Sequence, residues 1–271
     1  MKILLNIVDL NKATNKINNL GFVPTMGTLH KGHISLIRES QKKCKKTLVS
    51  IFINPTQFNN KTDYSSYPKN LKKDLNILKK MNVNYVFTPS VKDVYNYKRL
   101  KKITLKKVDK ILCAKYRKGH FEGVLDVMDR LINIIKPKKI FMGEKDFQQT
   151  YLIRKFIKNR YNSKIICCPT IRDKNMIALS SRNSLLNKEN LKKISKISKD
   201  LLNFKKKIPY NSNNLFKMLN HKKNQLQKNF NIKIEYLELR NSINLKQTVN
   251  LKKSKLFLAY FINNVRLIDN F

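Results

Sequence analysis

The chain has 271 residues, enough for a large buried core in one domain or in two smaller ones. Its 58 Lys and Arg against 17 Asp and Glu give a net charge of +41. These basic residues are spread along the whole chain without a block of five in a row, so we attribute the charge to compositional drift and expect no specific nucleic-acid partner. The four cysteines lack metal-ligand spacing and no apolar run has membrane length, so we expect a cytoplasmic protein without a membrane partner.

The first informative stretch is residues 21–33. A short apolar run ends at Pro24, a turn with a glycine follows, and His30 and His33 lie at the start of an apolar-periodic segment. This order predicts a strand, a tight loop and a helix N-terminus, whose unpaired backbone N–H groups suit a phosphate chain. A His-x-x-His pair alone can equally be structural, and its spacing differs from the His-Glu-x-x-His pair of zinc enzymes.

Polar side chains follow the next predicted strand. Residues 47–53 are β-branched and apolar, which is typical of a buried parallel strand, and Asn54 and Gln57 come directly after it. Ligands of open α/β sheets bind outside the carboxyl ends of the strands, so both amides are candidates for polar recognition. The alternative is an ordinary Asn-Pro turn.

The middle of the chain continues the alternation of helix and strand. Residues 69–81 predict a helix that carries Asp74, and residues 83–89 predict a strand, after which Ser90 can cap a short helix. We expect a loop over residues 118–123, which leads into an apolar-periodic helix.

A second strand–glycine–helix transition follows. Residues 139–142 predict a short strand that ends in Gly143-Glu144-Lys145-Asp146, where Lys145 can neutralise a phosphate or carboxylate. Asp146 can alternatively cap the helix that begins there. With a last strand at residues 164–169, the alternation predicts an α/β domain over residues 1–169 with a parallel sheet.

Residues 170–271 contain few side chains of catalytic type and predict a second, smaller α+β domain. Its first segment carries Ser180, Ser181 and Arg182, which can bind phosphate oxygens or simply form a turn before a helix that Asn187 caps. The pattern further predicts two Lys-rich helices and two strands, over residues 188–206, 213–229, 232–239 and 255–261.

Taken together, these motifs resemble the pantoate–β-alanine ligase family of the nucleotidyltransferase superfamily. The shared motifs are Pro-Thr-Met-Gly-x-Leu-His-x-Gly-His, Ser-Ile-Phe-Ile-Asn-Pro-x-Gln-Phe, Tyr-Pro-Lys, Gly-His-Phe-x-Gly-Val, Gly-Glu-Lys-Asp-Phe-Gln-Gln and Ala-Leu-Ser-Ser-Arg-Asn, which begin at residues 24, 50, 67, 119, 143 and 178. The resemblance covers nearly the whole chain in order, and it implies a Rossmann-like N-terminal domain with a C-terminal lid.

The resemblance implies an ATP-dependent ligation in two steps. Pantoate and ATP give pantoyl adenylate and pyrophosphate, and the amine of β-alanine then displaces AMP to form pantothenate. It also implies Mg²⁺ and a homodimer. The alternatives are another adenylyltransferase of the same superfamily, which would lack the Asn54/Gln57 pair, and a basic RNA-binding protein, which would show clustered charge.

The resemblance also implies the residues that bind ATP. Four of them, His33, His30, Lys145 and Arg182, would take catalytic roles, with His33 in the place of a proton donor. The full implied set is Met26, Gly27, Thr28, Leu29, His30, Lys31, Gly32, His33, Gly143, Glu144, Lys145, Asp146, Ile171, Leu179, Ser180, Ser181 and Arg182.

For the other ligands, the resemblance implies that Asn54, Gln57 and Gln149 bind pantoate, that Gln57 also contacts β-alanine, and that Asp74 lies near Mg²⁺. The chain departs from the family pattern in several places, and around Asp74 the acidic group is thinned by Lys72 and Lys73. Asp126 and Arg130 stand where Thr and Lys are usual, and Met176 stands where Gly is common. We expect the first two to change the substrate-facing helix and the third to change the shape of a loop in the lid.

Overall fold

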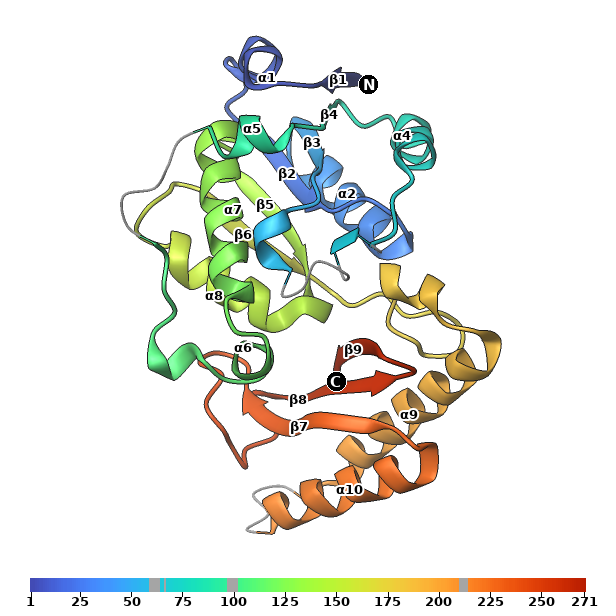
Figure 1. The fold of residues 1–271 in the computed structure, drawn as a ribbon. Helices are drawn as coiled ribbons and strands as arrows, with labels where there is room; N and C mark the ends of the chain where they lie inside the picture. The colour runs from blue at the N-terminus through green and yellow to red at the C-terminus, as the bar shows by residue number, and fades with distance from the viewer. Residues whose placement is uncertain (59–63, 66, 97–101, 210–213) are drawn as a thin grey trace. The chain divides into compact units, whose positions relative to one another are not determined.

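The structure is a computed structural model (Figure 1), and it describes residues 1–58, 64–65, 67–96, 102–209 and 214–271. These residues divide into two compact units, Met1–Thr170 and Ile171–Phe271. In these ranges, none of the helices is both long and apolar enough to span a membrane.

The first unit is built on a parallel sheet, which over the described residues has the strand order β1-β4-β3-β2-β5-β6 (Figure 1). Its strands are β1 (Lys2–Leu4), β2 (Leu20–Thr25), β3 (Lys46–Ile51), β4 (Tyr85–Phe87), β5 (Lys139–Gly143) and β6 (Lys164–Cys168). Each neighbouring pair is parallel, which confirms the predicted α/β class.

The helices of the first unit alternate with these strands. They are α1 (Ile7–Thr14), α2 (Lys31–Lys43), α4 (Leu71–Lys80), α5 (Val91–Val94), α6 (Cys113–Tyr116), α7 (His120–Ile135) and α8 (Phe147–Ile157). Short 3₁₀ turns join them at η1 (Pro55–Gln57), η2 (Lys107–Asp109) and η3 (Glu144–Asp146).

The structure differs from the sequence prediction at several places in this unit, and helices α1 and α6 were not predicted. Helix α7 begins at His120, inside the stretch predicted as a loop, because Gly119 adopts a left-handed φ of 80° and ends the preceding turn. The sequence also did not predict β1, since two of its three residues are exposed and carry no apolar alternation. The predicted cap is confirmed at Ser90, whose hydroxyl accepts the backbone N–H of Asp93.

The strand order brings three strand ends of the first unit together. β2 pairs with β3 on one side and with β5 on the other, and all three run parallel. The chain passes from β2 to β3 and β4 on one side and only later returns to β5 on the other, so the direction of winding reverses at β2. Such a switch point is where α/β sheets bind their ligands, outside the carboxyl ends of the strands.

The second unit has helices and strands, as predicted for an α+β domain, and in its described residues the strands form an antiparallel sheet of order β7-β8-β9. Its elements are η4 (Ser181–Leu185), α9 (Lys188–Lys207), α10 (Leu215–Phe230), β7 (Lys233–Asn241), β8 (Ser254–Ile262) and β9 (Val265–Asn270). The predicted helix start at residue 213 lies outside the described residues. The side chain of Asn187 accepts the N–H of Asn190 and caps α9, which confirms that prediction.

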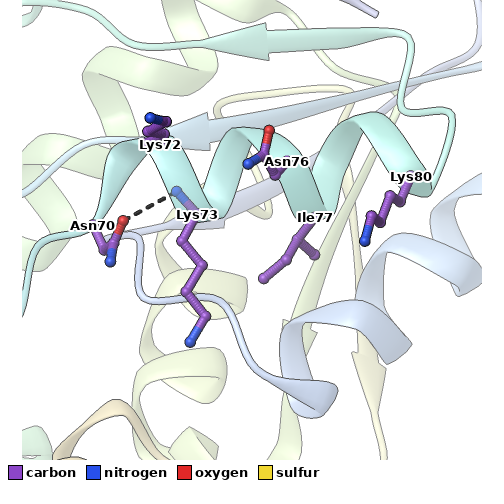
Figure 2. A pocket seen from close by; sticks show the side chains of 6 residues that line it. All are labelled: Asn70, Lys72, Lys73, Asn76, Ile77 and Lys80. Atoms are coloured by element: carbon purple, nitrogen blue, oxygen red, sulfur yellow. Dashed lines mark hydrogen bonds between the residues drawn. The ribbon is translucent and has the colours of Figure 1, made fainter.

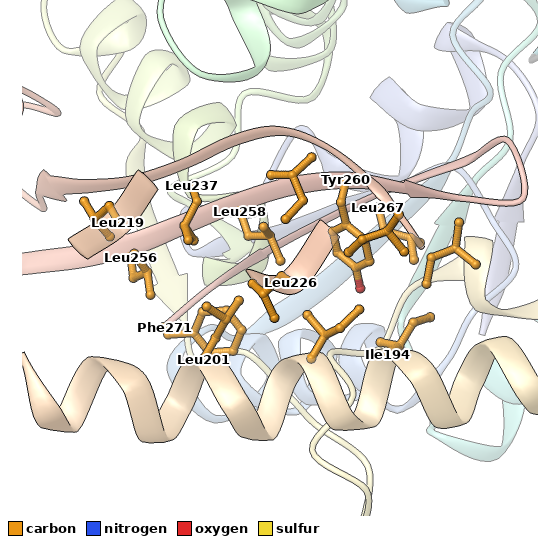
Figure 3. Close-up of a cluster of buried hydrophobic side chains, with 14 of the residues drawn as sticks. Ile194, Leu201, Leu219, Leu226, Leu237, Leu256, Leu258, Tyr260, Leu267 and Phe271 are labelled. Carbon is orange, nitrogen blue, oxygen red and sulfur yellow. The ribbon is translucent and has the colours of Figure 1, made fainter. Parts of the chain in front are cut away.

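The core of the second unit lies between its sheet and its helices. Ile194, Ile197 and Leu201 recur on one face of α9 and are buried, while most lysines of that helix occupy the other faces. Figure 3 shows Ile194 and Leu201 directed toward the side chains of Leu258 and Tyr260 on β8. This amphipathic packing explains how a Lys-rich segment still forms a stable helix.

A buried ion pair holds the start of the second unit to its last strand. The Arg172 guanidinium donates to both carboxylate oxygens of Asp269 at 2.8 Å, and it also donates to the carbonyls of Met176 and Asn270. The side chains of Arg172 and Asp269 are only 14% and 7% exposed. Removal of one partner therefore leaves a buried charge without its counter-ion.

We expect Asp269→Asn to destabilise the second unit by about 3 kcal/mol, because Arg172 then stays buried with its charge uncompensated. The measurement is the midpoint of thermal unfolding. Glu189→Gln is the matched control, since it breaks the exposed Glu189–Lys193 pair, and such surface pairs contribute less than about 1 kcal/mol. Equal midpoints for the two variants would contradict this account.

Candidate functional site

The loop between β2 and α2 has an unusual backbone that one carboxylate holds in place. Gly27 and Thr28 have φ values of 82° and 54°, in the left-handed region. The two oxygens of Asp74 accept the backbone N–H groups of Thr28 and Leu29 at 2.8 and 2.7 Å. A Cβ at residue 27 would lie 2.9 Å from the Asp74 carboxylate, so glycine permits this close approach.

Asp74 thus has a task in the loop that the sequence did not reveal. Its side chain is 2% exposed, and both of its oxygens face backbone donors. The residues that the structure describes also contain no group of three His, Cys, Asp or Glu side chains able to hold a metal ion. The proximity of Asp74 to Mg²⁺ stays a prediction, which this geometry does not support.

The two histidines form a reciprocal cap at the start of α2. His30 is the N-cap, and its Nδ1 accepts the N–H of Gly32 at 3.1 Å, while Nδ1 of His33 accepts the N–H of His30 at 3.3 Å. Because a backbone N–H can only donate, each Nδ1 is the acceptor, and the proton of each neutral ring lies on Nε2. The rings lie 4.1 Å apart between centroids. His30 therefore precedes the helix on which both histidines were predicted.

Both imidazoles are uncharged near neutral pH. Burial, with the positive charge of Lys145 as a smaller cause, lowers the pKa of His30 to about 4. Burial lowers the pKa of His33 to about 3, with further contributions from His30 and Lys145. The histidines are consequently neutral Nε2–H donors, and the η3 segment with Lys145 lies close enough to act on them electrostatically.

The end of β5 supplies the predicted charged turn. Gly143 is the last residue of β5, and the Lys145 ammonium lies 3.7 Å from the Asp146 carboxylate. Asp146 stands before α8, but its side chain makes no capping hydrogen bond, so the alternative of a helix cap is not realised. Gln149 lies in the first turn of α8, next to the buried Gln148, which donates to the carbonyl of Ile111.

The end of β3 carries the two predicted amides. Asn54 is 1% exposed and caps η1, and its Nδ2 donates to the carbonyl of Gly123 and to Oε1 of Gln57 at 3.2 and 3.3 Å. Its Oδ1 accepts the N–H of Thr56 at 3.3 Å and the Tyr95 hydroxyl at 2.7 Å. Asn54 is therefore more than an ordinary turn residue, because it orders the whole η1 segment.

Gln57 links this segment to the histidine loop. Its Nε2 contacts Sδ of Met26, which lies between β2 and the left-handed turn. Its backbone carbonyl accepts from Nδ1 of His120 at 2.7 Å. The structure thus brings the predicted substrate residue Gln57 against the predicted nucleotide loop.

Three contributors to this site were missed from the sequence: Tyr95, His120 and Gly123. A Cβ at residue 123 would lie 2.3 Å from the carbonyl oxygen of Thr56, so α7 packs directly on η1. The Gly-His-Phe-x-Gly spacing was a usable signal for His120 and Gly123, because two glycines near a helix start indicate close backbone approach. Tyr95 stands alone at the end of α5 and gave no such signal.

The other predicted nucleotide residues belong to the second unit. The carbonyl of Ile171 accepts the N–H of Leu179 at 3.0 Å, and Ser180 caps η4 by accepting the N–H of Arg182. Met176 adopts a φ of 67°, in the region where glycine is favoured, so this departure introduces local strain, while the change in the shape of the loop stays a prediction. The roles of Ile171, Leu179, Ser180, Ser181 and Arg182 toward a nucleotide stay predictions.

A basic hollow of about 420 Å³ lies along α4 (Figure 2). It does not include the predicted site residues of the first unit. Its lining is Asn70, Lys72, Lys73, Asn76, Ile77 and Lys80. The buried Asp74 is not among them, so α4 serves the site through its other face.

Comparison with known proteins agrees with these motifs. The family model for pantoate-beta-alanine ligase matches residues 2–271. Pantothenate synthetase of Clostridium botulinum (strain Okra / Type B1) is 39% identical over 280 residues, which cover 100% of this chain and 99% of the relative. Pantothenate synthetase of Thermosipho africanus (strain TCF52B) is 36% identical over 276 residues, with the same shares of 100% and 99%.

Solved structures give the same result over both units. Pantothenate synthetase from Thermus thermophilus has a TM-score of 0.90 at 27% identity and covers 100% of this chain and 99% of its own. Pantoate-beta-alanine ligase from Francisella tularensis, complexed with beta-gamma ATP and beta-alanine, has a TM-score of 0.84 at 38% identity and covers 100% and 97%. These matches favour neither another adenylyltransferase nor an RNA-binding protein. The chain belongs to the pantoate–β-alanine ligase family.

Proposed function

We propose that this ligase condenses (R)-pantoate with β-alanine at the expense of ATP, through a pantoyl adenylate. One observation carries the proposal: Gln57, the candidate for pantoate, contacts Met26 of the candidate ATP loop at adjacent strand ends. The ATP and beta-alanine complex of the Francisella relative supports the same choice of substrates. An acyl acceptor and a nucleotide that bind on these two segments would lie next to each other, as an adenylation requires.

In the first step, a pantoate carboxylate oxygen bonds to the α-phosphorus of ATP while the bond to the pyrophosphate oxygen breaks. Charge accumulates on the phosphate oxygens, where donors fixed in advance stabilise it. His30 and His33 supply neutral Nε2–H donors, and Lys145 supplies a positive charge beside them. The amides of Asn54, Gln57 and Gln149 would orient pantoate.

In the second step, the amine nitrogen of β-alanine attacks the acyl carbon. The bond from that carbon to the AMP oxygen breaks, and the nitrogen loses a proton. The segments Met26–His33 and Gly143–Asp146 would hold the AMP moiety through both steps. Leu179, Ser180, Ser181 and Arg182 of the second unit, together with the backbone of Ile171, would complete the nucleotide contacts.

We also propose that Mg²⁺ enters as the counter-ion of ATP. Mg²⁺ keeps several water ligands and commonly binds substrate phosphates with few protein carboxylates, which fits a loop whose anchoring carboxylate, Asp74 of α4, is engaged by backbone N–H groups. We further propose that the protein forms a homodimer, which the family resemblance supports. Measurement of the mass of the protein in solution tests this proposal.

The first test is the release of pyrophosphate from ATP and Mg²⁺. We expect release that requires pantoate, and continued AMP formation once β-alanine is added, because the amine clears the adenylate. The control omits pantoate and keeps β-alanine. Pyrophosphate release that is equally fast without pantoate would overturn the proposal.

The second test separates the capping and donating roles of His33. We expect His33→Asn to keep the cap, since the similarly short Asp93 reaches its own N-cap N–H in α5, and yet to lose the Nε2–H donor. Adenylation should then fall about 10²-fold, the loss typical of one transition-state donor. The measurements are the single-turnover rate and the unfolding midpoint.

His33→Ala is the matched variant for the cap. It should lose the same donor and also lower the unfolding midpoint, because a missing cap costs about 1 kcal/mol. A His33→Asn enzyme with the wild-type rate would remove His33 from the mechanism.

The third test concerns Gln57. We expect Gln57→Ala to raise the KM for pantoate about tenfold while the KM for ATP changes less than about twofold, since a missing hydrogen bond to a charged group costs about 1.5 kcal/mol or more. Steady-state kinetics with each substrate varied in turn give both constants. A parallel loss for pantoate and ATP would contradict the assigned role.

A further inference from the structure

The orientation of the Asn54 amide follows from its backbone neighbours alone. On one side, its oxygen faces the backbone N–H of Thr56, which can only donate. On the other side, its nitrogen faces the backbone carbonyl of Gly123, which can only accept. A flipped Asn54 amide would place a donor against a donor on the Thr56 side and an acceptor against an acceptor on the Gly123 side. The unflipped orientation is therefore strongly preferred.

The Asn54 amide then sets the orientation of the Gln57 amide. Because Nδ2 of Asn54 donates to Oε1 of Gln57, the NH₂ group of Gln57 must point the other way, toward Met26. Thioether sulfur is a weak hydrogen-bond acceptor. A carboxylate oxygen that replaces the Met26 sulfur as the acceptor therefore forms a stronger hydrogen bond with the Gln57 NH₂ group. Gln57 therefore presents a donor, as recognition of an anionic acyl substrate requires.

Tyr95 completes this chain of hydrogen bonds. Its hydroxyl donates to Oδ1 of Asn54 at 2.7 Å and lies 2.9 Å from Oγ1 of Thr56. Burial raises the pKa of Tyr95 above its ordinary value, so the phenol keeps its proton at neutral pH and stays a donor. The Tyr95–Asn54 bond is shorter than the bond from Thr56 N–H to the same oxygen.

The ring of Tyr95 is itself held by the pair of residues that departs from the family pattern. The Arg130 guanidinium lies 4.6 Å from the ring centroid, and Nε of Arg130 donates to the Asp126 carboxylate at 3.2 Å. Nη1 of Arg130 also donates to the carbonyl of Val94 at 3.4 Å, and the Arg130 side chain is 4% exposed. A planar guanidinium can stack on an aromatic ring in a way that an ammonium cannot.

We propose that Tyr95 is a positioning residue for pantoate, which acts by fixing the Asn54 amide and, through it, the donor group of Gln57. The Asp126–Arg130 pair supports this role by holding the Tyr95 ring. The inference rests on the proposed function, since it assigns pantoate to Gln57. It adds a residue that touches neither substrate nor nucleotide in this scheme.

Tyr95→Phe tests the inference, because it keeps the ring and the stack and removes only the hydroxyl. We expect the KM and the calorimetric Kd for pantoate to rise about fivefold, in keeping with one hydrogen bond of about 1 kcal/mol. The KM for ATP should stay near the wild-type value, and the unfolding midpoint should fall only by the amount expected of one lost hydrogen bond, since Thr56 still donates to Asn54.

The matched control is Tyr161→Phe. It removes a comparable hydroxyl bond in the same unit, from Tyr161 to Oδ1 of Asp129 at 2.7 Å, away from η1. We expect it to leave the pantoate constants unchanged. An equal rise of the pantoate KM in both variants would show that the loss of any such hydroxyl bond in this unit weakens pantoate binding, and it would overturn the proposal.

A double-mutant cycle tests the route through Gln57. If Tyr95 acts through Gln57, then Tyr95→Phe should change the pantoate Kd much less in the Gln57→Ala background than in the wild type. Equal effects in the two backgrounds would overturn the inference and leave the proposed function intact. Conversely, a wild-type protein that binds pantoate but releases no pyrophosphate would contradict the proposed function, while the binding cycle would still decide the role of Tyr95.

Discussion

The site depends on the two hydrogen bonds by which the Asp74 carboxylate holds the loop after β2. Gly27 and Thr28 both adopt left-handed backbone conformations. At Thr28, which is not a glycine, this conformation costs about 1 kcal/mol or more. The carboxylate offsets this cost by accepting the N–H groups of Thr28 and Leu29, which would otherwise be left unpaired near the protein interior. The loop then reaches His30 in the extended conformation that an N-cap needs. A residue of α4 therefore decides where both imidazoles stand.

The polar groups of the site share one physical device, which is orientation by backbone groups that can only donate or only accept. Backbone N–H groups fix the acceptor nitrogen of His30 and His33 and the oxygen of Asn54, and the Gly123 carbonyl fixes the Asn54 nitrogen. Imidazole and amide side chains are ambiguous by themselves, because each can present a donor or an acceptor. Here these ambiguities are resolved before a substrate arrives, and the side of His30, His33 and Gln57 that faces away from these contacts is a donor. Anionic substrates need donors, so the fold has selected the useful state in advance.

Much of this arrangement was predictable from local sequence signals. Strand ends followed by Asn54, by the histidine loop and by Gly143 were enough to predict a parallel sheet with its polar groups at one edge. The contacts of Asp74, Tyr95 and His120 were not predictable in the same way, since each joins segments far apart in the chain and depends on the strand order β4-β3-β2-β5. Strand β9 was missed for a related reason: its burial follows from pairing with β8 rather than from its own alternation.

The large positive charge and the neutral histidines act at different ranges. A net charge of +41 attracts anions over a distance that salt reduces to about 10 Å, and this attraction favours no phosphate group over another. The buried imidazoles contribute no charge at neutral pH, partly because the nearby Lys145 opposes their protonation. Under the proposed function, a triphosphate bound at this loop would have the opposite sign from Lys145, so it would raise the pKa of both rings and would make their protonation easier as charge develops on phosphate. In the proposed function, attraction would thus come from the net charge, whereas discrimination would come from donors whose strength responds to the bound ligand.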